Sequence, residues 1–134
     1  MIDRYNSALG RMRIEDKIID LSIALETMLA KDTEISFRLS LFLAHMAADK
    51  ASGVEVAYKL FRTLYDARST IVHGGLHNRR SKAQIVEVEN DFKRILNFSR
   101  ACMLYYFAFL ENNPPDRWDA HCLGLVLGST KRAL

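Results

Sequence analysis

Apolar residues recur every three or four positions along most of the chain, which is the spacing of an amphipathic helix. The first such series consists of four aliphatic residues, Ile18, Leu21, Leu25 and Leu29. It predicts a helix from about Asp16, which can cap it, to Ala30. Two further helices are predicted over about 34–49 and 54–73. No segment of useful length alternates apolar and polar residues as a strand would.

The same pattern continues into the second half of the chain. Glycines at 74–75 are predicted to end the third helix, because glycine accepts the left-handed conformation that closes a helix. After a polar loop, Ser81 is the predicted cap of a long helix that reaches about Glu111. Prolines at 114–115 precede a last short helix, whose predicted buried residues are Trp118, Cys122 and Leu125. The predicted fold is all-α, a bundle of four or five helices.

Composition places the chain among soluble globular domains. The 134 residues suffice for one domain, and 49% are hydrophobic and 26% charged. The excess of 19 Lys and Arg over 16 acidic residues is mild, so it is compatible with nucleic acid without indicating it. Cys102 and Cys122 cannot form a disulfide framework and are predicted to be reduced. With no signal-peptide pattern and no apolar run near the roughly 18–20 residues of a membrane span, we expect a cytoplasmic protein.

Two charged residues fall on apolar helix faces. At 100° per residue, Arg68 lies within the apolar sector of the predicted helix 54–73, and Glu26 lies within that of the first predicted helix. Because buried charges are generally paired, an ion pair between Glu26 and Arg68 is predicted, with Arg38 competing for Glu26 or joining it. The pair could be a structural clasp, or it could position a guanidinium beside a phosphate-binding site.

His73 lies on the polar side of the same predicted helix. It follows Arg68 by five residues, which separates the two by about 140°, so they do not share a face. They can converge only if the helix end unwinds near Gly74 or a second chain supplies the other half. Ser69 and Asp66 lie on the face of His73, and either could orient its imidazole. Alternatively, His73 is an ordinary C-terminal helix residue that favours the helix dipole.

The segment 65–74, with the sequence YDARSTIVHG, resembles the signature of HEPN domains, specifically the Apea-like group. The shared feature is an arginine, four residues and a histidine. Residues 19–26 (IDLSIALE) resemble the first-helix pattern of that family, which ends in Leu-Glu, and residues 34–39 (EISFRL) resemble the segment that opens its second helix. The resemblance covers about 14–110 of a single domain, 1–134, whose C-terminal helix is less diagnostic.

This resemblance implies a helical bundle that forms a homodimer in which the motif helices of two chains face each other. In catalytically active relatives this arrangement is a metal-independent endoribonuclease. By position, Arg68 and His73 are the motif pair and Glu26 is the acidic partner. Many active relatives have Asn, Asp or His after the motif arginine, whereas this chain has Ser69. Apea-like domains are often attached to other domains, so further domains are expected. An antitoxin is another expected partner.

In the predicted mechanism the 2′-hydroxyl of RNA attacks the neighbouring phosphorus and leaves a 2′,3′-cyclic phosphate, with no metal or cofactor. His73 would be the general acid or base, and Arg68 would bind the phosphate and stabilise the transition state. Ser69 and Asp66 would orient these groups.

A basic cluster follows the motif. Arg79, Arg80 and Lys82 are predicted to contact the RNA backbone from a loop. The alternative function is a non-catalytic dimerising module that binds nucleotide, RNA or a protein partner in a defence or stress system, because fold does not fix activity.

Overall fold

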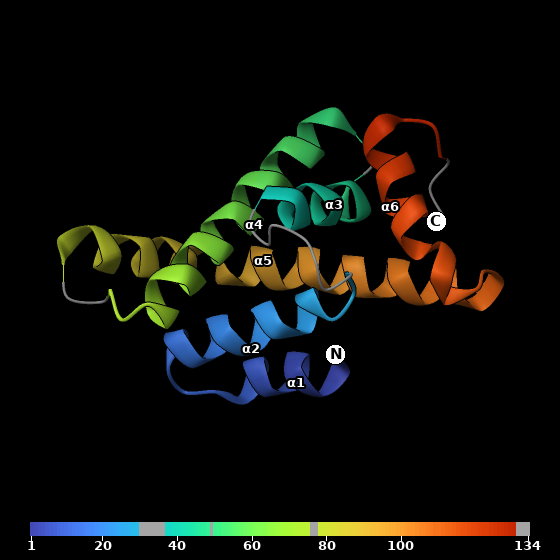
Figure 1. Cartoon of the computed structure of the whole chain (residues 1–134). Helices are drawn as coiled ribbons and strands as arrows, with labels where there is room; N and C mark the ends of the chain where they lie inside the picture. Colours follow the sequence, from blue (N-terminus) through green and yellow to red (C-terminus); the bar gives the residue numbers. More distant parts are fainter. Residues whose placement is uncertain (30–36, 49, 76–77, 131–134) are drawn as a thin grey trace.

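The computed structural model describes residues 1–29, 37–48, 50–75 and 78–130, and this part of the chain is helical without strands (Figure 1). It contains six α-helices and one 3-10 turn: α1 (Ile2–Gly10), α2 (Ile14–Glu26), α3 (Phe37–Ala47), α4 (Ala51–Val72), α5 (Arg79–Asn112), η1 (Pro115–Arg117) and α6 (Trp118–Leu127). The predicted all-α class is confirmed. None of the described helices is long and apolar enough to cross a bilayer.

The longest helix, α5, runs through the whole molecule and carries the other helices on its sides (Figure 1). The antiparallel pair α1 and α2 lies on one side, while α3 and α4 lie on another and α6 packs near the C-terminal end of α5. The core is formed where these helices meet, and its largest fully buried side chains include Tyr105, Phe61 and Leu25. The first turns of α5 extend beyond the other helices, at the left of Figure 1.

Several predicted helix boundaries need correction. Asp16 does not cap α2, because that helix already begins at Ile14 and places Asp16 in its first turn. Ser81 does not cap α5 either: the side chain of Asn78 accepts a hydrogen bond from the Ser81 amide at 2.8 Å, so the helix begins earlier. The predicted boundaries at residues 30 and 34 lie outside the described residues.

Helix α1 has no counterpart in the sequence prediction. Only Ala8 is buried in it, but the prediction overlooked Ile2, Tyr5 and Leu9, which recur at the spacing of an amphipathic helix. It is fastened to α2 by Asp20, whose buried carboxylate accepts hydrogen bonds from Arg4 Nη1 at 2.9 Å and Arg11 Nε at 2.7 Å. These two guanidinium groups hold the pKa of Asp20 below its ordinary value. Charge-assisted contacts therefore attach an otherwise weakly buried helix.

The three residues predicted to be buried in the C-terminal helix, Trp118, Cys122 and Leu125, are buried. Much of the packing of this helix comes from aromatic rings around Trp118. The indole Nε1 of Trp118 donates a hydrogen bond to the carbonyl of Met28, which follows α2. The imidazole of His121 stacks on this indole at a centroid distance of 5.9 Å, and its Nε2 lies 2.7 Å from the Tyr105 hydroxyl. Helix α6 is thus tied both to α5 and to the end of α2.

Candidate functional site

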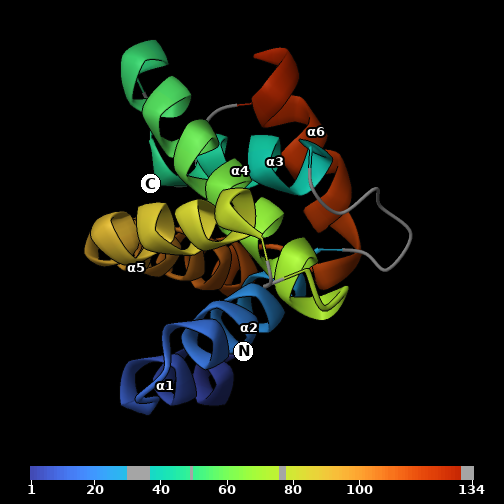
Figure 2. The same cartoon turned by 90° about the vertical axis from the view of Figure 1, so that its left-hand side faces the viewer.

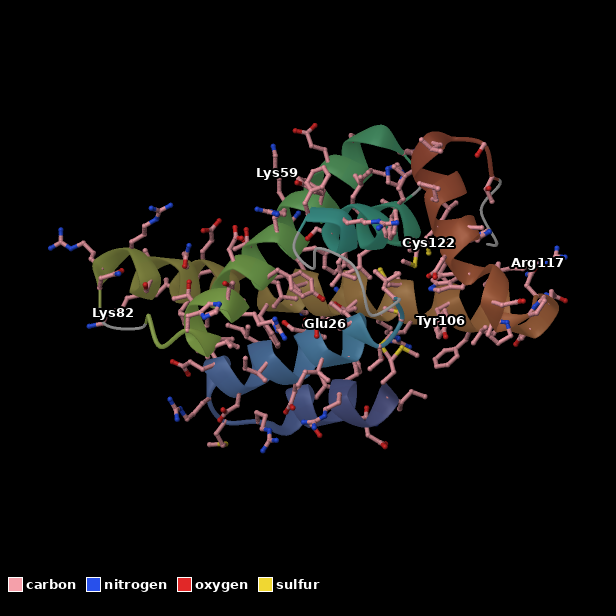
Figure 3. The ribbon with its side chains drawn as sticks, in the orientation of Figure 1. Glu26, Lys59, Lys82, Tyr106, Arg117 and Cys122 are labelled. Atoms are coloured by element: carbon pink, nitrogen blue, oxygen red, sulfur yellow. The ribbon has the colours of Figure 1, made fainter. Side chains whose placement is uncertain are left out.

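The site is built around an ion pair between α2 and α4. The Nε of Arg68 lies 3.2 Å from Oε1 of Glu26, and its Nη2 lies 3.4 Å from Oε2. About a quarter of each side chain is exposed, 26% for Arg68 and 24% for Glu26. Glu26 lies in the middle of the molecule, where α2 approaches α4 (Figure 3). The predicted pairing of Glu26 with Arg68 is confirmed.

The geometry of this pair is governed by charge more than by aligned hydrogen bonds. Arg68 Nε and Glu26 Oε1 are both buried, yet neither has a hydrogen-bond partner among the described residues, since the N–H is not directed at the oxygen. Burial raises the pKa of the Glu26 carboxyl, and the Arg68 charge opposes that rise only in part. The Arg68 side chain is still 26% exposed, so part of it can be reached from solvent.

Tyr65 closes the same interface one turn before Arg68. Its hydroxyl donates a hydrogen bond to the Ser22 carbonyl at 3.4 Å. Burial, reinforced by the nearby Glu26 carboxylate, raises the pKa of this phenol well above its ordinary value. Tyr65 was not among the predicted site residues, although its position three residues before Arg68 places it on the same helix face.

Arg38 does not join the pair, so the expectation that it would compete for Glu26 is not met. It lies in the first turn of α3 with its guanidinium over the Phe42 ring, 5.5 Å from the ring centroid. Phe42 is four residues further on and therefore on the same face of α3. Local stacking thus gives Arg38 a partner within its own helix, and within the described part of the chain it makes no ion pair with Glu26.

His73 follows the last residue of α4 and is exposed. Its amide donates to the Ser69 carbonyl at 3.1 Å, and Gly74 has the positive φ of 71° that was predicted to end the helix. Because α4 remains helical to Val72, the five-residue spacing holds Arg68 and His73 on different sides. No hydrogen bond or ion pair joins these two side chains in the described residues of one chain.

The residues predicted to orient His73 have other surroundings. Asp66 Oδ1 lies 3.6 Å from Nη2 of Arg62, four residues earlier on α4, and Ser69 is exposed. Across the residues that the structure describes, the imidazole of His73 has no hydrogen bond to either side chain. Arg62 was not predicted as a site residue, although its spacing from Asp66 is that of a helical ion pair.

The basic cluster lies beside the end of α4. The Thr70 hydroxyl lies 2.8 Å from Oε1 of Gln84, which links the last turns of α4 to the first turns of α5. Arg79 and Arg80 belong to the first turn of α5 instead of a loop, because Asn78 caps the helix before them. Together with Lys82 they are exposed, and Figure 3 shows Lys82 near the projecting tip.

The described residues contain no group of three or more His, Cys, Asp or Glu side chains arranged to hold a metal ion. Comparisons with protein-family models, curated proteins and solved structures found no significant match.

Proposed function

We propose that the chain is an RNA-binding, HEPN-type domain that acts as a homodimer and cleaves RNA without a metal ion, through attack by the 2′-hydroxyl. The observation that carries this proposal is the ion pair between Glu26 and Arg68, at the two positions where the family resemblance places the acidic partner and the motif arginine. The exposed His73 at the end of the same helix supports it as well.

Each proposed group has a chemical task. An imidazole exchanges a proton readily near neutral pH, so His73 accepts the proton of the 2′-hydroxyl or donates one to the departing 5′-oxygen. Arg68 stabilises the negative charge on the phosphoryl oxygens through its guanidinium group. The new bond joins the 2′-oxygen to phosphorus while the bond to the 5′-oxygen breaks, which gives a 2′,3′-cyclic phosphate and a 5′-hydroxyl.

The geometry of α4 supports the proposal that a second copy completes the site. Arg68 and His73 lie on different sides of this helix, so one phosphate cannot reach both on a single undistorted chain. In the proposed dimer, Arg68 of one chain and His73 of its partner share the phosphate. The basic cluster Arg79, Arg80 and Lys82 holds the flanking backbone, and residues 67–86 contain no acidic side chain to oppose it.

The test is incubation of the purified protein with RNA in EDTA beside the His73→Ala and Arg68→Ala variants. We expect His73→Ala to lose about 10²–10⁴-fold in cleavage rate, the usual contribution of a general acid or base, and Arg68→Ala to lose about 10²–10³-fold, as for a donor that stabilises charge in the transition state. Lys59→Ala is the control, because it removes a positive charge from the same helix and Lys59 pairs with Glu55 at 2.8 Å, away from the motif. Equal cleavage by wild type and His73→Ala would identify a contaminating nuclease and end the proposal.

One observation favours the non-catalytic alternative, a dimerising module that binds RNA, nucleotide or a protein partner. Asp66 pairs with Arg62, and Ser69 is exposed, so the imidazole of His73 is not oriented within one chain. Under this alternative the wild type binds RNA without cleaving it. Loss of RNA affinity in a folded, dimeric Arg68→Ala variant would then mark a binding site, whereas unfolding of that variant would mark a structural clasp.

A further inference from the structure

One face of α5 carries cations and amides along most of its length. Its polar members, all of them exposed, are Arg79, Lys82, Asn90, Lys93, Arg94, Asn97 and Arg100. On an ideal helix they lie within about 60° of Asn97. We call these seven residues the α5 outer face. From Arg79 to Arg100 it extends about 32 Å.

Acidic residues are absent from this face over residues 79–104. Glu87 and Glu89 lie about 80° from Asn97 and Asp91 about 120° away, so they flank it. Arg94 is 3.8 Å from Asp91, a loose pair that leaves 58% of the Arg94 side chain exposed. Helix α5 forms the left edge of the molecule in Figure 2. Near its start, Ile14 and Glu15 of α2 line a shallow pocket together with Lys82 and Val86, whereas all seven residues of the outer face are exposed. The face is therefore a strip of net positive charge.

A hollow of about 230 Å³ opens on this strip, lined by Arg94, Asn97 and Phe98. Phe98 is half-buried and rests on Phe61, with ring centroids 6.5 Å apart, so its ring is held in place from below. An aromatic ring can stack on a base, an amide can hydrogen-bond to a base edge, and a guanidinium can bind phosphate. An acidic peptide would use the cations but would gain nothing from the ring.

We propose that the α5 outer face binds single-stranded RNA, with phosphates along the cations and one base in the hollow against Phe98. The proposal rests on the function proposed above, because it names how the RNA is held beyond the motif. The proposed RNA path starts at the basic cluster of Arg79, Arg80 and Lys82 and continues along α5. Positive surface combined with an aromatic platform is the usual means of binding single strands.

The test measures affinity for a short, fluorescent 2′-O-methyl oligonucleotide, which lacks the attacking hydroxyl and so separates binding from cleavage. The combined Lys93→Ala and Arg100→Ala variant should bind roughly tenfold more weakly, and the slope of log affinity against log salt should fall by about 1.4. The control variant Lys59→Ala with Arg117→Ala removes equal charge from other helices and should bind as wild type (Figure 3). Equal loss in both double variants, or no loss in the first, would overturn the proposal.

Phe98→Leu tests the hollow separately. It should weaken binding of the oligonucleotide by about tenfold but leave binding of an abasic oligonucleotide unchanged, since only the former can stack. An unchanged melting temperature would show that the variant keeps the stability of the wild type. Displacement of the oligonucleotide by polyglutamate as readily as by unlabelled oligonucleotide would assign the face to an acidic protein instead. If RNA is cleaved but the outer-face variants bind normally, only this proposal fails; if RNA binds to the face uncleaved, only the nuclease assignment fails.

Discussion

Partial burial makes the pairing of Glu26 with Arg68 energetically important. Each side chain is about three-quarters withdrawn from water, so either charge left alone would lack the solvation it has in the unfolded chain. This pair could be predicted from the sequence, because each residue lies within the apolar sector of its own predicted helix. The place of Arg38 could not, since stacking on Phe42 depends on how the first turn of α3 is packed.

Removal of the Arg68 side chain should therefore lower the free energy of unfolding more than neutralisation of Glu26 does. Arg68→Ala leaves a buried Glu26 oxygen facing no cation, and we expect its free energy of unfolding at neutral pH to fall by about 1–3 kcal/mol. Glu26→Gln keeps an oxygen toward Arg68 and should change it less. Urea denaturation measures both, with Lys59→Ala as the control. An unchanged midpoint for Arg68→Ala would show that the pair contributes no stability.

Because the pKa of Glu26 is raised, the difference in stability between wild type and Glu26→Gln should depend on pH. A carboxyl whose pKa is higher in the folded than in the unfolded chain binds its proton more tightly when folded. Wild type should therefore lose stability relative to Glu26→Gln as pH rises from the unfolded pKa of about 4.3 through the folded one. A difference that stays constant across this window would contradict the raised pKa.

At the scale of elements, periodic apolar faces made α4 and α5 predictable to within a few residues. Helix α1 was missed although Ile2, Tyr5 and Leu9 recur at helical spacing, whereas its attachment through Arg4 and Arg11 to the buried Asp20 depends on how the chain folds back. The start of α5 was misplaced for a related reason. Both Asn78 and Ser81 are suitable caps, and only the course of the chain after α4 places Asn78 at the capping position.

The attachment of α6 should weaken in acid. Burial lowers the pKa of His121, so the folded chain favours the neutral imidazole beside the Tyr105 hydroxyl. Its stabilising contribution is complete above the unfolded pKa of about 6.5 and is lost as pH falls toward the folded pKa. Trp118 is the one tryptophan of the chain and stacks on this ring, so its fluorescence should change over the same pH range. His121→Gln should remove that transition, whereas His73→Ala should retain it.

At the scale of the whole molecule, the described residues of one chain do not bring Arg68 and His73 together. The sequence correctly indicates that the two residues occupy different sides of one helix. In the proposed dimer, the way they meet would depend on the contact between two copies, which the periodicity of one chain does not reveal. The exposure of the α5 outer face to solvent likewise becomes apparent only from the fold.

Mixing two inactive variants tests the shared site. If Arg68 of one chain works with His73 of its partner, a dimer of Arg68→Ala with His73→Ala has one intact site. Equal mixing of the two should then restore about a quarter of wild-type cleavage, because half of the dimers are mixed and each has one working site of two. Either variant alone is the baseline. Failure to recover cleavage, with subunit exchange verified by native mass spectrometry, would place both groups in one chain.

Both natural thiols are inaccessible in the folded chain. Cys102 and Cys122 are buried, and burial raises the pKa of Cys122 to about 12, so the thiolate that alkylating reagents attack is scarce. A single cysteine introduced on the surface would accordingly be the preferred point of attachment for a maleimide spin label. Placed at Arg79 in each copy, such labels would turn the separation of the two helix tips into a distance readable by pulsed electron resonance.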